Sequence, residues 1–301
     1  MILELARRFV RENIQTTEIS HPPLNFRKIS KYKFDAYIVG SCQVWRRAYS
    51  SHISNFFLDF LDDLPVKRVA YAASFGVDRW ELSDQQTKVC VPLAQRFNAI
   101  SVRGKSGIEL CRKYLGVDNA VHVLDPTLLL DPEIYISLVE KDQTPPSDGD
   151  LMAYILDKSA NNNQITDRIS RRFELKPVYI MPQKKFLDYD RKSISQCIFP
   201  PVTAWLRGYI DAKYVVTDSF HGTVFSILFN KPFVTIGNKK RGQSRFTSLL
   251  EMFGLENRLV ESVDDLTDEL LTEPINWDDV NARLRERRAE SVKFLEEALK
   301  S

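Results

Sequence analysis

The chain has few cysteines, almost no net charge and none of the common nucleotide-binding motifs. Among its 301 residues, 42 Lys and Arg face 40 Asp and Glu, a formal net charge of +2, which gives no electrostatic reason to expect a nucleic-acid partner. No G-x-G-x-x-G, G-x-x-x-x-G-K or G-x-S-x-G sequence occurs, so the usual nucleotide-binding and hydrolase interpretations lose support. The cysteines are scattered without a CxxC pair: Cys42, Cys90, Cys111 and Cys197. This pattern excludes a disulfide framework and a zinc site and favours a reducing, cytoplasmic setting.

Long apolar runs are also absent. No segment reaches the ~20 apolar residues that a membrane-spanning helix needs. The first ten residues carry Glu4, Arg7 and Arg8 among apolar side chains, which indicates an amphipathic helix and not a targeting signal. A hydrophobic content of 44% with 27% charged residues is typical of a soluble globular protein. The length is sufficient for two domains.

Short apolar runs alternate with amphipathic stretches along the whole chain. The first series predicts strands at 34–39, 67–73, 98–102 and 120–124, with helices at 52–61, 83–97 and 105–115. The second predicts strands at 151–156, 177–180, 213–217 and 232–236, with helices at 161–172, 201–210, 221–229, 245–252 and 278–299. The polar, Pro-containing stretch 141–150 between them is predicted to be a linker.

This alternation predicts an α/β protein with two Rossmann-like domains facing a cleft. The N-terminal domain would cover residues 1–145 and the C-terminal domain residues 151–301. Ligands of such sheets bind beyond the carboxyl ends of the strands, so the residues that follow each predicted strand are the candidates for a site.

The strongest candidate follows the strand at 213–217. Asp218 and Ser219 are good helix N-cap residues, and His221 would then lie in the first helical turn. Free backbone N–H groups and the helix dipole favour an anion there, and Gly222 would let a ligand approach the backbone. The alternative is a capped helix with an incidental histidine.

The turn after the strand at 34–39 is a second candidate. Gly40 permits a tight turn, Ser41 and Gln43 offer polar contacts, and Trp45 could stack on a sugar. The alternative is an ordinary turn with a packing tryptophan.

Two basic segments are further candidates. Arg103 follows the third predicted strand and could bind a carboxylate or phosphate with two hydrogen bonds. The loop 239–245 is basic and could hold an anion, although such charge runs are usually only solvated. Asp125 is expected to cap a turn, and His52 and His122 have no partners at metal-ligand spacing.

Several of these stretches, in this order, resemble the polysaccharide pyruvyl transferase family. They are 34–45 (FDAYIVGSCQVW), 71–76 (YAASFG), 100–107 (ISVRGKSG), 124–130 (LDPTLLL) and, most specifically, 217–226 (TDSFHGTVFS), followed by 231–233 (KPF) and Arg245 ahead of 248–250 (SLL). The resemblance implies a GT-B-like fold and transfer of a pyruvyl group from phosphoenolpyruvate to a sugar of a surface polysaccharide or its precursor, giving a pyruvate ketal.

The resemblance also implies roles for named residues. In the family, the His of the Ser-Phe-His segment and the Arg of the Val-Arg segment are tied to the donor, and here these are His221 and Arg103. We expect His221 to donate a proton or to hold the departing phosphate. The remaining predicted donor-binding residues are Ser219, Phe220, Gly222, Thr223 and Arg245, and the predicted acceptor-binding residues are Gly40, Ser41, Gln43 and Trp45.

The expected partners follow from the same resemblance. Phosphoenolpyruvate would be the donor, no metal or other cofactor is expected, and the acceptor would be a glycan or a lipid-linked glycan. A lipid-linked acceptor would bring the enzyme to a membrane surface without an anchor of its own.

Three departures from the family keep other interpretations open. Cys42 stands where the family stretch usually has Asp, Gly104 stands where it often has Glu, and the first strand-turn-helix unit is expected to be missing, which would shorten the N-terminal domain. The alternatives are a GT-B-type glycosyltransferase that uses a sugar nucleotide and a catalytically degenerate binding protein of the same fold.

Overall fold

The structure contains two compact units, each assembled from three segments of the chain. The computed structural model describes residues 3–18, 29–182, 194–237 and 242–300. The β1–β4 unit consists of residues 19–129, 239–254 and 278–301, and the β5–β9 unit consists of residues 1–18, 130–238 and 255–277. The predicted domains are continuous in sequence, whereas both units draw on segments that lie far apart along the chain.

The β1–β4 unit is built on a four-stranded parallel sheet with the order β1-β2-β3-β4. The strands are β1 (Ala36–Val39), β2 (Lys67–Ala73), β3 (Ala99–Val102) and β4 (Val121–His122). Its α-helices are α3 (Asp84–Ala94), α4 (Ser106–Leu110), continued by a π turn at Cys111–Leu115, α9 (Ser244–Phe253) and α11 (Trp277–Lys300). All four strands predicted for this part are confirmed.

The stretch 52–61 was expected to form one helix and instead forms two short 3₁₀ helices, Ile53–Phe57 and Asp59–Leu61. Leu58 between them has φ +58°, in the left-handed region, so the α-helical hydrogen-bond ladder cannot continue through it. Further 3₁₀ turns in this unit lie at Ser30–Tyr32, Arg47–Tyr49 and Pro126–Leu128.

The C-terminal helix α11 packs against the sheet of the β1–β4 unit. Ser291 Oγ of α11 accepts a hydrogen bond from the Leu124 backbone N–H at 3.0 Å. The Phe294 ring lies 6.4 Å from that of Tyr71 on β2, and Lys67 Nζ donates to the Leu299 carbonyl at 2.6 Å. The end of the sequence therefore stabilises the sheet formed near its beginning.

The β5–β9 unit is built on a five-stranded parallel sheet with the order β6-β5-β7-β8-β9. The strands are β5 (Leu151–Tyr154), β6 (Pro177–Val178), β7 (Tyr214–Thr217), β8 (Phe233–Ile236) and β9 (Leu259–Val260). Every residue of β7 and β8 is buried, as expected for parallel strands with both faces covered. The order reverses at β5, and this switch point is where ligands of parallel sheets bind.

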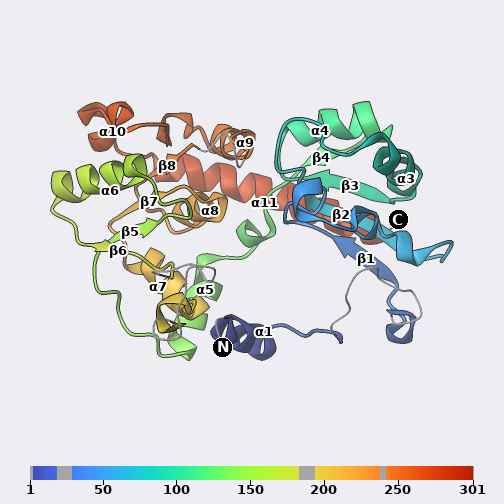
Figure 1. Cartoon of the computed structure of the whole chain (residues 1–301), viewed down its shortest axis with the longest axis horizontal. Coiled ribbons are helices and arrows are strands. Elements are labelled where there is room, and N and C mark those ends of the chain that lie inside the picture. The colour runs from blue at the N-terminus through green and yellow to red at the C-terminus, as the bar shows by residue number, and fades with distance from the viewer. Residues whose placement is uncertain (1–2, 19–28, 183–193, 238–241, 301) are drawn as a thin grey trace. The chain divides into compact units, whose positions relative to one another are not determined.

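Helices cover both faces of this sheet, with α6 on one side and α5 and α7 on the other, and α1 lies against α5 and α7 (Figure 1). Their bounds are α1 (Glu4–Asn13), α5 (Pro132–Lys141), α6 (Ala160–Phe173), α7 (Val202–Asp211), α8 (Phe220–Leu228) and α10 (Asp268–Thr272), with 3₁₀ turns at Ile194–Cys197, Glu256–Arg258 and Val263–Asp265. The N-terminal amphipathic helix is thus confirmed.

The stretch 141–150 lies inside the β5–β9 unit. The Ser147 N–H donates to Asp211 Oδ2 on α7 at 2.8 Å, and Asp150 Oδ1 accepts from the Lys176 N–H at 2.8 Å. These bonds attach the stretch to two elements of one unit, so it is not a linker between the two units.

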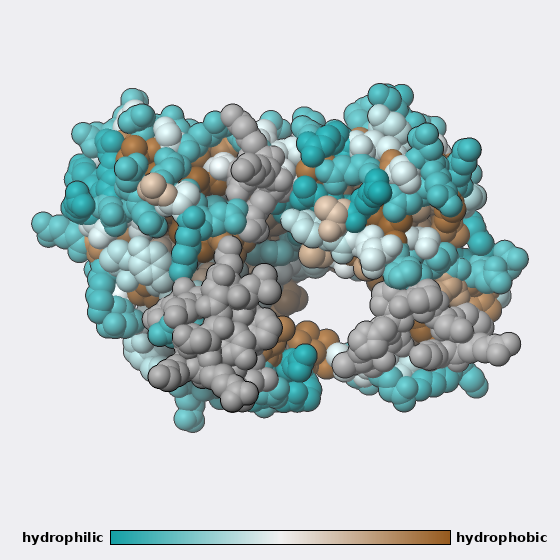
Figure 2. All heavy atoms as spheres, in the orientation of Figure 1, coloured by the Kyte–Doolittle hydropathy of each residue, from teal (hydrophilic) through white to brown (hydrophobic). Residues whose placement is uncertain are grey.

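Hydrophilic side chains cover most of the visible surface, and hydrophobic ones appear between them in separate patches (Figure 2). Within the described residues, no helix combines the length and the apolar composition needed to cross a bilayer.

The crossing of β7 and α8 depends on Gly222. A Cβ added there would lie 2.8 Å from the Thr217 Cβ and would overlap Thr217 Oγ1. Thr217 Oγ1 in turn donates to the Tyr154 carbonyl at 2.8 Å, so the side chain that fills the space is itself held. Gly222 is therefore required for close packing of the helix on the strand.

We predict that Gly222→Ala lowers the stability of the protein by about 1–3 kcal/mol, the usual effect of overpacking, measured as a lower melting temperature. Gly104→Ala is the matched control, because its Cβ would meet only Ser248 Oγ at 4.0 Å. Equal melting temperatures for the two variants would contradict this packing role.

Candidate functional site

Three arginines with buried side chains come together in the β1–β4 unit. Arg103 follows β3, Arg46 lies in the segment after β1, and Arg245 lies in the first turn of α9. Their exposed fractions are 5%, 6% and 9%. Arginine is among the residues least often buried without a partner, so this concentration needs a physical explanation.

Carboxylates hold two of these arginines in place. Arg103 Nη1 donates to Asp125 Oδ2 at 2.6 Å, and both side chains are almost completely buried. Arg46 Nε lies 3.3 Å from Glu81 Oε2, and Arg46 Nη1 donates to Gln43 Oε1 at 2.9 Å. Asp125 also accepts from the Thr127 N–H and hydroxyl, which fixes the carboxylate that orients Arg103.

Arg245 is destabilised as a cation. Burial, followed by the positive charges of Arg103 and Arg46, lowers its pKa to about 10. Two carboxylates, Asp125 and Glu81, stand against these three cations, so an anion that entered beside Arg245 would offset the remaining positive charge. The electrostatics of this place therefore favour a small anion.

Glycines bring α9 close to the end of β2. Gly242 has φ +94°, and a Cβ there would overlap the Gly76 carbonyl oxygen, so only glycine allows this approach. A small cavity lies beside Arg245 and is lined by Ala73–Val77, Gly104, Ser106, Gly107 and Ser244. Small side chains at the carboxyl ends of β2 and β3 thus leave space next to the guanidinium group.

The predicted acceptor turn is present, but its residues have different surroundings. Gly40 is exposed with φ +149°, and a Cβ would overlap the Tyr71 carbonyl oxygen. Gln43 holds Arg46, as described above, and Ser41 is half-buried. Trp45 is 1% exposed, stacks on Phe57 with ring centroids 5.0 Å apart and donates to the Phe56 carbonyl. These contacts favour the packing alternative for Trp45.

In the β5–β9 unit, the segment after β7 forms the predicted capped helix start. Ser219 is the N-cap of α8, and its Oγ accepts from the Gly222 N–H at 3.4 Å. Asp218 is 2% exposed and accepts from the Leu156 and Asp157 N–H groups at 2.6 and 2.8 Å. This carboxylate ties the segment after β7 to the segment after β5, where the strand order reverses.

The residues that follow on α8 point in different directions. His221 is half-buried, with the Phe220 ring edge-on at 5.7 Å. Thr223 is fully buried, and its Oγ1 contacts Thr235 Oγ1 at 2.8 Å and donates to the Ser219 carbonyl. The contacts of Gly222 and Thr223 are therefore those of packing residues, and His221 is the titratable side chain of this turn.

The predicted donor residues belong to both units. Arg103 and Arg245 lie in the β1–β4 unit, whereas Ser219 to Thr223 lie in the β5–β9 unit. That Arg103 and His221 bind one donor molecule stays a prediction. Of the basic loop 239–245, positions 239–241 lie outside the described residues.

Arg46, which directly follows Trp45, was not among the predicted site residues, and Asp125 was expected only to cap a turn. The Asp125 cap is present, and its ion pair with Arg103 adds the second role. No short-range pattern signals either contact, since 22 residues separate Arg103 from Asp125.

We predict that Asp125→Asn destabilises the protein by about 3–5 kcal/mol, because it leaves the buried Arg103 cation without its carboxylate. The amide keeps an oxygen for the Thr127 contacts, so the change tests the charge. Chemical denaturation would measure the effect, with the exposed Asp118→Asn as control. A change as small as that of the control would contradict the prediction.

We predict that inorganic phosphate raises the melting temperature of the wild-type protein and raises that of Arg245→Gln much less. A ligand that binds only the native state at a hundred times its Kd adds about 2.7 kcal/mol of stability. Arg47→Gln, which removes an exposed arginine, should keep the wild-type response. An undiminished response of Arg245→Gln would exclude Arg245 from the anion site.

Comparisons with known proteins agree with the predicted fold. Two solved structures align over 99% of this chain: UDP-GlcNAc 2-epimerase from Neisseria meningitidis bound to UDP-GlcNAc, with 90% of that chain covered, 11% identity and a TM-score of 0.58, and UDP-N-acetylglucosamine 2-epimerase from Rickettsia bellii, with 86% covered, 12% identity and a TM-score of 0.53. At such identities the similarity shows the fold alone, which is GT-B-like with two Rossmann-like parts.

Sequence comparison gives the family. No curated protein sequence matches the chain. Residues 1–240 match the family described as polysaccharide pyruvyl transferase, a match that spans most of the chain and confirms the predicted resemblance. The chain therefore belongs to the polysaccharide pyruvyl transferase family.

Proposed function

We propose that this protein transfers the pyruvyl group of phosphoenolpyruvate to a sugar of a surface polysaccharide or its precursor and forms a pyruvate ketal. Family membership supports the class of reaction. The observation that carries the choice of donor is the group of three buried arginines in the β1–β4 unit, Arg46, Arg103 and Arg245, of which Arg245 lines a small cavity.

The chemistry of the donor matches this group. Phosphoenolpyruvate is small and carries a phosphate and a carboxylate, and guanidinium groups bind both anions through two parallel hydrogen bonds. Arg103 is held in a fixed orientation by Asp125, and Arg46 by Glu81 and Gln43, so little side-chain entropy would be lost on binding. Arg245 would gain the most, because the incoming negative charge offsets both the burial and the repulsion that lower its pKa.

The reaction then needs a proton and two hydroxyl groups. Protonation of the methylene carbon leaves a cation-like centre at C2, which one sugar hydroxyl attacks. The C2–O bond to phosphate breaks, and a second hydroxyl adds to C2 to close the ketal. Each of the two sugar hydroxyls loses a proton. One of these protons restores the acid that protonated the methylene carbon, and the other is carried away by the phosphate. In this proposal His221 donates the proton to the methylene carbon. It is a half-buried imidazole at the start of α8.

The acceptor and the setting follow from the same proposal. The turn of Gly40, Ser41 and Gln43 provides polar groups for a glycan or lipid-linked glycan acceptor. We place the reaction in the cytoplasm, a setting supported by Cys42, Cys90 and Cys111, which are not joined in disulfides. Nothing in the proposed chemistry requires a metal or a nucleic-acid partner.

We predict that phosphoenolpyruvate raises the melting temperature of the wild-type protein and that UDP-GlcNAc does not. UDP-GlcNAc is the relevant competitor because the Neisseria meningitidis epimerase binds it on a similar fold. Arg46→Gln should weaken the response to phosphoenolpyruvate, while the exposed Arg47→Gln should preserve it. A response to UDP-GlcNAc alone would favour a glycosyltransferase, and no response to either ligand would favour a degenerate protein.

A measurement of the reaction rate distinguishes the proposed proton donor, His221, from residues that only bind the donor. Incubation with phosphoenolpyruvate and a panel of oligosaccharides, followed by phosphate release and product mass, measures ketal formation. His221→Ala should lose at least about 10²-fold in rate, the usual contribution of a general acid, yet still respond to phosphoenolpyruvate in melting. The exposed His52→Ala is the control, and near wild-type turnover of His221→Ala would remove His221 from the mechanism.

A further inference from the structure

Helix α1 has two faces of different character, and neither contains a buried residue. Leu5, Phe9 and Asn13 recur at intervals of four, so they lie on one side of the helix. Leu3, Arg7, Val10 and Ile14 recur at intervals of three and four and lie on the opposite side, with Leu3 and Ile14 as the flanking cap residues.

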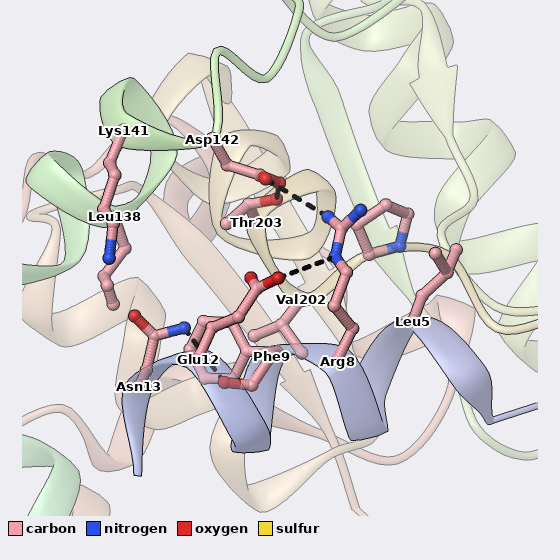
Figure 3. A pocket seen from close by; sticks show the side chains of 11 residues that line it. Leu5, Arg8, Phe9, Glu12, Asn13, Leu138, Lys141, Asp142, Val202 and Thr203 are labelled. Carbon is pink, nitrogen blue, oxygen red and sulfur yellow. Dashed lines mark hydrogen bonds and ion pairs between the residues drawn. The ribbon is translucent and has the colours of Figure 1, made fainter.

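The first face lies against the β5–β9 unit. Leu5, Arg8, Phe9, Glu12 and Asn13 point from α1 toward a pocket completed by Leu138, Lys141 and Asp142 from α5 and its end, and by Pro201, Val202 and Thr203 from the start of α7 (Figure 3). Arg8 Nη2 donates to Asp142 Oδ1 at 3.1 Å, and Asp142 Oδ2 accepts from Thr203 Oγ1 at 2.6 Å. These contacts hold the inner face of α1 against α5 and α7, so the opposite face of the helix points away from the β5–β9 unit.

The outer face carries three apolar side chains that are about half exposed. Leu3 is 47% exposed, Val10 38% and Ile14 52%. Arg7 and Arg11 are exposed beside them, and Arg11 Nη2 lies 2.8 Å from Glu4 Oε1. A helix that only packed on its own unit would have polar residues at these outer positions.

From these observations we infer that the outer face of α1 binds the surface of an anionic lipid membrane. Leu3, Val10 and Ile14 would enter the boundary between headgroups and acyl chains, and Arg7 and Arg11 would contact anionic headgroups. The helix would lie in the plane of the interface while its inner face keeps its contacts with α5 and α7. This inference does not depend on the proposed reaction.

The size and composition of the outer face favour lipid over a protein partner. A stable protein interface buries roughly 1,200–2,000 Å² in total, which three aliphatic side chains cannot supply. Interfacial helices need only a short apolar stripe bordered by basic residues, because the bilayer surface is itself a continuous partner. Arg7 and Arg11 outnumber Glu4, the acidic residue paired with Arg11, so the border of the stripe keeps a net positive charge that complements the lipid.

Co-sedimentation of the full chain with vesicles tests this inference. Wild-type protein should bind vesicles of phosphatidylcholine mixed with phosphatidylglycerol and should bind pure phosphatidylcholine much less. The double variants Val10→Gln/Ile14→Gln and Arg7→Gln/Arg11→Gln should each weaken binding by roughly tenfold or more. Gln keeps helix propensity, and melting temperature and phosphoenolpyruvate response should stay unchanged because the inner face is intact.

The control applies the same exchange elsewhere on the surface. Arg285→Gln/Val292→Gln removes an exposed arginine and a 37% exposed valine from α11, and its binding should match wild type. The inference is overturned if the wild-type protein binds neither vesicle or both equally, or if the α1 variants bind as well as the control. It is also overturned if sedimentation velocity shows a dimer that only the α1 variants lose, since α1 would then contact a second copy.

Discussion

The buried ion pair between Arg103 and Asp125 is the constraint on which the candidate site depends. Removing two charges from water is expensive, and the pair is stable only because its geometry is close and Asp125 accepts further hydrogen bonds from Thr127. The pair fixes a guanidinium group at the end of β3. The pKa of Arg245 on α9 is lowered chiefly by burial and in addition by the charge of Arg103. The protein thus keeps electrostatic strain at a place where an anion could relieve it.

The β5–β9 unit uses a carboxylate in a different way. Asp218 is directed at backbone N–H groups of Leu156 and Asp157, so it joins the ends of β5 and β7. Gly222 lets α8 approach β7 closely, and the Thr223 hydroxyl is engaged inside the unit. The start of α8 is therefore rigid on its inner side, and the position of His221 is set by packing that a ligand need not provide.

Most strands and helices could be predicted from the sequence, whereas the contacts between elements far apart in the sequence could not. The strands were predictable because continuous apolar runs such as 213–217 require burial on both faces, and α8 because Ser219 is a strong N-cap. The placement of α9 and α11 in the β1–β4 unit was not predictable, because contacts such as Leu124 with Ser291 join segments 167 residues apart. The stretch 141–150 has the composition of a linker, yet Asp150 and Ser147 use their hydrogen bonds within one unit.

The same limit applies to individual site residues. Trp45 and Arg46 are neighbours in a turn, and no local pattern shows that the indole fills the core while the guanidinium joins two others. Gly222 fits a ligand-approach role and a packing role equally well until Thr217 is seen beside it. Residue type predicts what a side chain can do, whereas its neighbours decide which of these possibilities is used.

One fold hosts many functions, so the choice between a pyruvyl donor and a sugar nucleotide depends on the local charge of the site. Here Cys42 is informative, because the resembling family stretch usually has Asp at that position. Negative charge on Cys42 would raise the pKa of Arg245, which places residue 42 within electrostatic reach of the arginine. A thiol carries less negative charge at neutral pH than a carboxylate. The surroundings of Arg245 are thus more positive with Cys42 than with Asp, in the direction that the proposed anionic donor would need.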